Sequence, residues 1–255
     1  MATFVVGDIH GNASALDDLL AGIETFLSAS DTIVFLGDYI DRGPNSRGCV
    51  EQILRLQDQS SAEVITLLGN HEQWMLRTLR DFNRHSWLLG MEAFETIRSY
   101  SEQAAVRVRD AVHRAGPRIV TEQLRLPYED FFDAMPRSHQ TFFEGLQTWY
   151  RSPDALCVHG GLSLDGTPVE EQVEDDLVWG PDDFPEAYDG RELVVYGHRG
   201  DTPLDATGRP KPRMRQNTIG LDSSEHGVLT AVRLPDRRVF QRDGVRPGPR
   251  QSGKC

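Results

Sequence analysis

The chain has 255 residues and a formal net charge of −12, and 38% of its residues are hydrophobic. A chain of this length and composition buries a full core and fits one domain. Its negative charge, with no basic stripe to offset it, excludes nucleic acid as an expected partner.

Strands and helices alternate in the first third of the chain. The predicted strands are TFVVGD, TIVFLGD and EVITLLGN, which are short runs rich in β-branched and other apolar residues. Helices are predicted between them over 14–28, with Ser14 as N-cap, and over 46–58. Nearly continuous apolar strands in this order indicate a sheet buried on both faces.

The middle of the chain, from His71 to about Tyr150, is predicted to be mostly helical, with a last helix over 140–150. Strand patterns return in ALCVHGG, ELVVYGH, NTIGLD and VLTAVRL. Residues 83–150, the helical insert, therefore separate two sheet halves, and their position alone suggests a lid.

Two stretches after the insert, 165–191 and 201–215, are expected to be loops because they are rich in charged residues and proline. We expect one domain over 1–243. The Pro/Gly-rich segment 244–255 lacks periodicity, which predicts a disordered tail.

Neither a membrane nor the secretory route is indicated. No apolar run approaches the roughly 18 residues of a membrane span, and the start, MATFVVGD, shows no signal-peptide pattern. Three cysteines without a CxxC pair predict neither a structural zinc site nor a disulfide framework. We expect a cytoplasmic protein without a membrane partner, and nothing in the sequence indicates its oligomeric state.

Each of five predicted strands ends in a polar cluster that contains glycine: GDIHG, GDYIDRGP, GNHE, HGG and GHR. Asp38 follows Asp8 by 30 residues and Asn70 follows Asp38 by 32, each about one β-α-β unit. Since ligands of α/β sheets bind beyond the carboxyl ends of the strands, we expect the five clusters to converge.

The clusters contain a mixed set of metal-ligand side chains: Asp8, His10, Asp38, Asn70, His159 and His198. A single residue of this kind at a strand end is more often a helix cap or a hydrogen-bonded structural histidine. Carboxylate, carboxamide and imidazole together suit manganese, iron or zinc. Six ligands exceed the needs of one catalytic ion but fit two divalent ions about 3.5–4 Å apart with a bridging carboxylate.

In this order, GDIHG, GDYIDRGP, GNHE, HGG and GH resemble the phosphoprotein phosphatase (PPP-type) branch of the calcineurin-like metallophosphoesterases, over residues 4–242. The resemblance implies an α/β fold, a β-sandwich flanked by helices with a dimetal site at the strand ends. It implies one metal on Asp8, His10 and Asp38. It implies a second on Asp38, which bridges, Asn70, His159 and His198.

The resemblance also assigns catalytic roles. His71 would donate a proton to the leaving group, paired with Asp41, while Arg42 and Asn70 would contact the substrate phosphate. The implied reaction is in-line attack by a metal-bound hydroxide on a phosphomonoester, with two divalent ions, first of all manganese, as cofactors.

The sequence departs from the family pattern at one phosphate contact. Bacterial relatives have an arginine two residues after a tryptophan, whereas here Trp179 is followed by Gly180 and Pro181. Arg199 stands where relatives commonly have threonine, so it could supply the missing cation, as could Arg213 or Arg215.

These features predict a Ser/Thr protein phosphatase, whose substrate is a phosphorylated protein. The first alternative is a symmetrical dinucleoside tetraphosphate hydrolase or another small-molecule phosphoesterase, because it shares the metal ligands. A non-catalytic metal-binding scaffold is the remote alternative, and the intact set of ligands argues against it.

Overall fold

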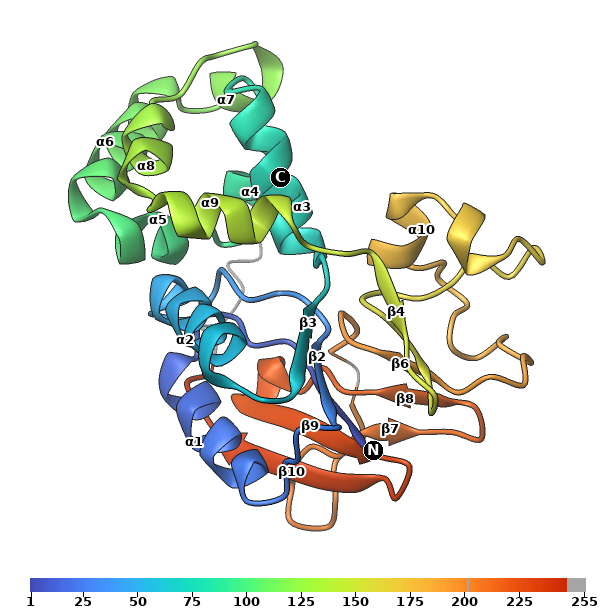
Figure 1. Cartoon of the computed structure of the whole chain (residues 1–255). Coiled ribbons are helices and arrows are strands. Elements are labelled where there is room, and N and C mark those ends of the chain that lie inside the picture. Colours follow the sequence, from blue (N-terminus) through green and yellow to red (C-terminus); the bar gives the residue numbers. More distant parts are fainter. Residues whose placement is uncertain (201, 247–255) are drawn as a thin grey trace.

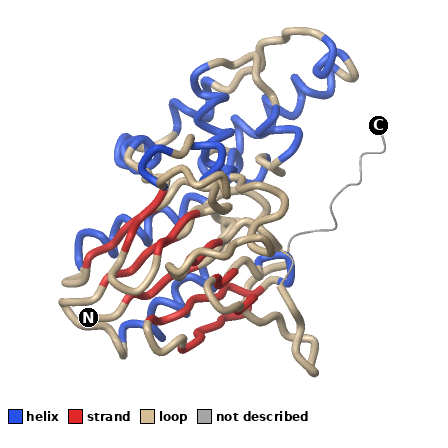
Figure 2. Tube along the Cα trace, turned by 90° about the vertical axis from the view of Figure 1, so that its right-hand side faces the viewer, coloured by secondary structure: helices blue, strands red, loops and turns tan. Residues whose placement is uncertain are grey.

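Two five-stranded sheets pack face to face in the computed structural model, which describes residues 1–200 and 202–246 (Figure 1). Helices cover the outer face of the first sheet, and the helical insert lies beyond the strand ends (Figure 2). The α/β sandwich flanked by helices is therefore confirmed. The part of the predicted tail from residue 247 onward lies outside the described residues.

The first sheet has the order β10-β9-β1-β2-β3. Its strands are β1 (Thr3–Val6), β2 (Thr32–Phe35), β3 (Glu63–Thr66), β9 (Val228–Leu234) and β10 (Arg238–Asp243). The first three run parallel, in the register Thr3–Thr32–Glu63, and β9 pairs antiparallel with β1. The sequence pattern did not predict β10, a charged edge strand without a long apolar run.

The second sheet has the order β4-β5-β6-β8-β7. Its strands are β4 (Trp149–Arg151), β5 (Leu156–Val158), β6 (Val194–Tyr196), β7 (Arg213–Met214) and β8 (Thr218–Gly220). The predicted helix over 140–150 is wrong beyond Glu144, because Trp149 and Tyr150 pair with β5 instead. The predicted loop 201–215 likewise ends in the short edge strand β7.

Alternate residues of the parallel strands point to opposite sides, and both sides are buried. Val5, Val34 and Leu36 face Cys157, Val195 and Ile219 of the second sheet. On the other side, Phe4, Ile33 and Phe35 pack under α1 (Ala13–Glu24) and α2 (Ser46–Gln59). Double burial explains the continuous apolar runs and confirms that prediction.

The first helix is shorter than predicted. It begins at Ala13 after the N-cap Asn12, not Ser14, and ends at Glu24 rather than near residue 28. The Asp31 carboxylate accepts hydrogen bonds from the backbone N–H groups of Ser28 and Ala2. These bonds tie the segment after the helix to β1.

The remaining helices gather above the strand ends. They are α3 (Asn70–Arg80), α4 (Ser86–Gly90), α5 (Phe94–Tyr100), α6 (Glu102–Ala115), α7 (Arg118–Thr121), α8 (Glu129–Ala134) and α9 (Arg137–Glu144). Helices α5 and α9 pack on α2, and the insert shares one hydrophobic core with α1 and α2. A lid function of the insert stays a prediction.

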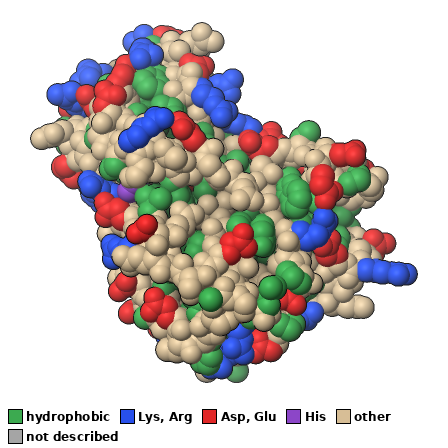
Figure 3. Space-filling view, in the orientation of Figure 1, with side chains coloured by type: hydrophobic (Ala, Val, Ile, Leu, Met, Phe, Trp, Pro, Cys, Tyr) green, Lys and Arg blue, Asp and Glu red, His purple; other side chains and the backbone are tan. Residues whose placement is uncertain are grey.

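The segment 165–191 is not all loop, since it holds the 3₁₀ turn η1 (Val169–Glu171) and α10 (Glu174–Val178); a second turn, η2 (Ser224–His226), precedes β9. Acidic and basic side chains are interspersed on the face in Figure 3, whose outline is indented between the insert and the α10 side. Within the described residues, no helix has the length and hydropathy needed to cross a membrane.

Candidate active site

All five predicted clusters meet at one edge of the sandwich. Asp8 follows β1, Asp38 follows β2 and Asn70 follows β3, while His159 and His198 follow β5 and β6 of the second sheet. Parallel pairing within each sheet places these strand ends on the same side. Four of these five side chains are buried, and that of His198 is partly exposed.

Two groups of ligand atoms share the Asp38 carboxylate. The atoms of His10, Asp38 and His71 lie within 4.8 Å of one another, as do those of Asp38, His159 and His198. His10 Nε2 lies 3.4 Å from Asp38 Oδ2, and His159 Nε2 lies 3.4 Å from Asp38 Oδ1. Each oxygen of Asp38 thus faces a different group, which is the arrangement a bridging carboxylate needs.

The hydrogen bond of His159 to the main chain directs its lone pair into the second group. His159 Nδ1 lies 2.9 Å from the Leu36 carbonyl, so it carries the proton and Nε2 bears the lone pair. That lone pair faces the amide of Asn70, whose Oδ1 lies 3.0 Å from both His159 Nε2 and His198 Nδ1. Oδ1 and the lone pair that faces it are both acceptors and repel each other. A cation between them would relieve this repulsion, and so would a reversed Asn70 amide that turns its NH₂ group toward the two imidazoles.

The pKa shifts favour a cation. Burial raises the pKa of Asp38 to about 8 and that of Asp8 well above its usual range. Burial also lowers the pKa of His159 and brings that of His198 to about 4, so both imidazoles are neutral, as metal ligands must be. Neutral imidazoles beside buried carboxylates, whose charge Arg42 offsets in part, fit a divalent metal.

The turn that carries Asp38 adopts an unusual backbone conformation. Asp38, Asp41 and Arg42 have positive φ angles of 54°, 70° and 64°. Gly37, at φ +113°, approaches the GNHE loop so closely that a Cβ there would lie 2.6 Å from the Gly69 nitrogen. For non-glycine residues such a conformation costs energy, so surrounding contacts must hold it.

Glu72 holds this turn, a role that sequence analysis missed. Its buried carboxylate accepts hydrogen bonds from the backbone N–H groups of Asp38, Tyr39, Ile40 and Gly69, at 2.9 to 3.2 Å. Burial raises the pKa of Glu72 to about 8, and the nearby Asp38 adds to the effect. An acidic residue in the first turn of a helix that follows a strand could have indicated this role in the sequence.

His71 and Asp41 are in direct contact, with Nδ1 and Oδ2 2.7 Å apart. Burial lowers the pKa of His71 and raises that of Asp41. Within the described residues, His71 Nε2 is buried without a hydrogen-bond partner, and it lies 3.8 Å from Asp38 Oδ2. The ring thus has one nitrogen fixed and the other directed toward the ligand groups.

The cations near the site differ in their contacts. Arg42 Nη1 lies 2.9 Å from His10 Nε2, at the border of the first ligand group. Arg199 donates to the carbonyls of Gly160 and Pro181, so its guanidinium lies at the residue that replaces the family arginine. Arg213 and Arg215 both pair with Glu186. A phosphate-binding role for these last three arginines stays a prediction.

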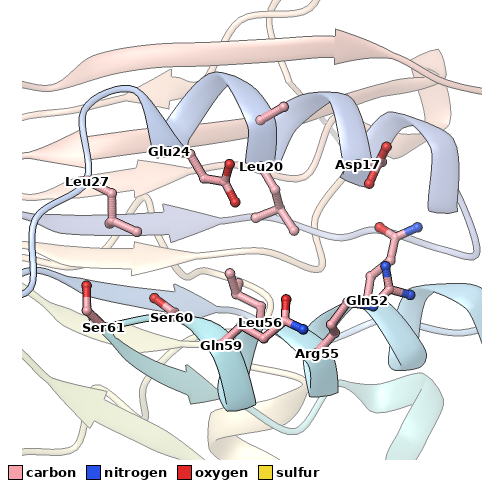
Figure 4. A pocket seen from close by; sticks show the side chains of 11 residues that line it. Asp17, Leu20, Glu24, Leu27, Gln52, Arg55, Leu56, Gln59, Ser60 and Ser61 are labelled. Carbon is pink, nitrogen blue, oxygen red and sulfur yellow. The ribbon is translucent and has the colours of Figure 1, made fainter.

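A separate groove of about 460 Å³ lies between α1 and α2 and is lined by residues such as Leu20, Glu24 and Arg55 (Figure 4). These residues belong to the middle and C-terminal parts of the two helices. The helices run opposite to the parallel strands, so the groove lies away from the strand ends that form the site. None of the predicted site residues lines it.

Comparison with known proteins finds similar proteins over nearly the whole chain. The symmetrical bis(5'-nucleosyl)-tetraphosphatase of Pectobacterium carotovorum subsp. carotovorum (strain PC1) is 27% identical in an alignment 293 positions long, gaps included, that covers 99% of each chain. A crystal structure provisionally assigned as a diadenosine tetraphosphatase superposes with a TM-score of 0.61 at 23% identity, covering 96% of this chain and 94% of that one. The cold-active protein-tyrosine phosphatase of a psychrophilic Shewanella sp. superposes with a TM-score of 0.58 at 17% identity, covering 94% and 77%.

The two structural matches show the fold alone, since their sequence identity is low. The family is shown by a model described as calcineurin-like phosphoesterase, which matches residues 1–225. The matched range includes every predicted ligand and both members of the His71–Asp41 pair. This chain belongs to the calcineurin-like phosphoesterase family and is a metal-dependent phosphoric ester hydrolase.

Proposed function

We propose that the protein hydrolyses dinucleoside polyphosphates, and that it cleaves diadenosine tetraphosphate symmetrically into two molecules of ADP. The observation that carries the hydrolytic part is the Asp38 carboxylate shared by two ligand groups beside His71 and Asp41. The nucleotide part rests on full-length similarity to symmetrical tetraphosphatases. These relatives support the alternative drawn from the sequence better than its first prediction, a Ser/Thr phosphatase.

The residues present fit two divalent ions. Asp8, His10 and Asp38 would hold one ion; Asp38, Asn70, His159 and His198 would hold the other. Bound there, the ions supply positive charge for phosphoryl oxygens and lower the pKa of water. Manganese is our first expectation, with iron or zinc as alternatives, because the set mixes carboxylate, carboxamide and imidazole.

The protein's own groups orient the substrate and supply a proton. Arg42, beside His10, presents a planar donor fork that matches phosphoryl oxygens. Water adds to one inner phosphorus, and the bond from that phosphorus to the central bridging oxygen breaks. One ADP leaves on that oxygen, the other keeps the added oxygen, and His71 is placed to protonate the leaving group.

A Ser/Thr phosphatase activity remains the second candidate, and one structural observation favours it. ADP leaves readily as a stabilised anion, whereas the alkoxide of serine needs a proton as it departs. The buried His71–Asp41 pair, with its 2.7 Å contact, is well suited to that harder proton transfer.

Parallel assays separate these functions. The purified protein with manganese would be given diadenosine tetraphosphate, a phosphoserine peptide, a phosphotyrosine peptide and p-nitrophenyl phosphate, with Asp38→Asn as the control for contaminating activity. We expect the highest kcat/KM on the dinucleotide, with ADP as the sole nucleotide product. A mixture of ATP and AMP would refute symmetrical cleavage, and preference for the phosphoserine peptide would refute the nucleotide assignment.

A further inference from the structure

Two side chains of the helical insert reach the buried carboxylate of Asp41. Trp87 of α4 donates its indole N–H to Oδ2 at 2.8 Å, and Thr96 of α5 donates its hydroxyl to Oδ1 at 2.6 Å. Both side chains are completely buried. The insert therefore supplies two of the hydrogen bonds that orient this carboxylate.

Thr96 also holds the backbone of the same residue. Its hydroxyl oxygen lies 2.8 Å from the Asp41 backbone nitrogen, and Ser46 Oγ lies 3.2 Å from that nitrogen. Asp41 has a φ of 70°, a conformation that needs such support. One threonine thus fixes both the main chain and the side chain of Asp41.

The third donor to this carboxylate is His71 itself. Its Nδ1 lies 2.7 Å from Oδ2, the same oxygen that accepts the Trp87 indole. With Oδ1 bonded to Thr96 and Oδ2 to Trp87, the carboxylate cannot rotate without losing a hydrogen bond in a buried site. The orientation of the His71 ring follows from that of the carboxylate.

We propose that Trp87 and Thr96 are positioning residues for the proton donor, so that the helical insert forms part of the catalytic machinery in addition to any role as a cover. The proposal rests on the assigned role of the His71–Asp41 pair, not on the identity of the substrate. It also limits any lid movement, because the base of the insert, at α4 and α5, is bonded to Asp41.

The test uses variants that remove a donor and keep the shape. Trp87→Phe and Thr96→Val each delete one hydrogen bond, whereas Thr96→Ser keeps the hydroxyl. Thr78→Val is the matched control, because Thr78 is a buried threonine of α3 whose hydroxyl donates to the Arg84 carbonyl, 3.2 Å away. The manganese-loaded full chain would be assayed on phenyl phosphate, a poor leaving group, and on p-nitrophenyl phosphate, a good one.

We expect Trp87→Phe and Thr96→Val to lower kcat on phenyl phosphate about 10- to 100-fold, with less effect on p-nitrophenyl phosphate and on KM. Thr96→Ser should keep most of the activity, and Thr78→Val should affect both substrates equally. A second readout is the downfield NMR signal of the His71 Nδ1 proton, identified by its loss in His71→Asn and recorded on the zinc-loaded chain, because paramagnetic manganese would broaden it. We expect it to shift in both donor-deleting variants.

Two results would overturn the proposal. An unshifted proton signal together with unchanged leaving-group dependence in folded Trp87→Phe and Thr96→Val would show that the two bonds are structural only. If His71→Asn itself keeps full turnover on phenyl phosphate, the acid assignment and this proposal fall together. Failure of the protein to hydrolyse diadenosine tetraphosphate would refute only the proposed substrate, because both readouts are independent of it.

Discussion

His71 and Asp41 share a hydrogen bond of 2.7 Å between Nδ1 and Oδ2. The other ring nitrogen of His71 is buried, has no hydrogen-bond partner among residues 1–200 and 202–246, and lies 3.8 Å from Asp38. An imidazole held in this way donates a proton from that nitrogen only as the imidazolium, which the Asp41 carboxylate stabilises. His71 also belongs to the first ligand group, so a metal-binding role has to be distinguished from an acid role.

His71→Asn distinguishes them. If His71 is the acid, the variant keeps both metals and loses about 100- to 1,000-fold in kcat on esters with poor leaving groups, because no proton reaches the departing oxygen. Metal content by mass spectrometry and kcat on phenyl phosphate check this. His85→Asn is the control, since His85 is a buried histidine that bonds Tyr128 and the Leu124 carbonyl in the insert. Loss of metal in His71→Asn would make His71 a ligand instead.

Asp38→Asn should lose bound metal and activity together. Each carboxylate oxygen of Asp38 faces a different histidine at 3.4 Å, so one substitution weakens both ligand groups. Titration with manganese followed by activity measurement tests this. Asp31→Asn is the control, because Asp31 is a buried carboxylate just before β2, at the end of the strand opposite to Asp38. This variant should bind metal as the wild type does. Full metal content in Asp38→Asn would refute the bridging assignment.

Metal binding should strengthen as the pH rises toward 8. Burial raises the pKa of Asp38 to about 8, so without a cation this group is largely protonated at neutral pH and must lose its proton to bind metal. The lowered pKa of His159 adds no competing proton. We expect the apparent affinity to rise about tenfold per pH unit for each proton displaced. Calorimetry in two buffers of different ionisation enthalpy would count the protons, and identical affinity at pH 6 and pH 8 would contradict the prediction.

The convergence of the candidate ligands could be predicted from the sequence because its causes are local. Asp8, Asp38 and Asn70 each follow an apolar strand and a glycine, and parallel strands bring their ends together whatever the rest of the fold does. The same logic applies to His159 and His198. Polar residues that follow predicted strands can therefore be recognised as candidate site residues from short segments of sequence.

The supporting residues could not be predicted because their partners are set by tertiary packing. Trp87 and Thr96 read as ordinary core residues of a helical segment, and only the folded insert brings them to Asp41. The edge strands β4 and β10 were missed for a related reason. Their short, partly charged sequences become strands only by pairing with β5 and β9.

Glu72→Gln should destabilise the protein by roughly 2–4 kcal/mol and weaken metal binding. Glutamine keeps one acceptor oxygen but replaces the other with an NH₂ group. That group cannot accept the hydrogen bonds that backbone N–H groups now donate to Glu72, so buried donors are left without a partner. Urea unfolding and manganese titration measure the two effects. Glu63→Gln, on the exposed end of β3, is the control and should change neither. Unchanged stability in Glu72→Gln would show that Glu72 does not hold the turn.

Asp31→Asn should lower stability in a pH-dependent way. Burial opposes ionisation of Asp31, but hydrogen bonds from the backbone N–H groups of Ala2 and Ser28 outweigh it and hold its pKa below the usual value. A carboxyl whose folded pKa is depressed stabilises the protein above its unfolded pKa, about 3.9, and loses that contribution as the pH falls through the folded pKa.

We therefore expect Asp31→Asn to cost about 1 kcal/mol between pH 5 and pH 7, with the difference from wild type shrinking below about pH 4. Urea unfolding over a pH series measures it. Asp58→Asn, at an exposed position of α2, should show no such dependence. A constant difference from wild type down to the acid limit would mean that Asp31 acts through packing and not through its charge.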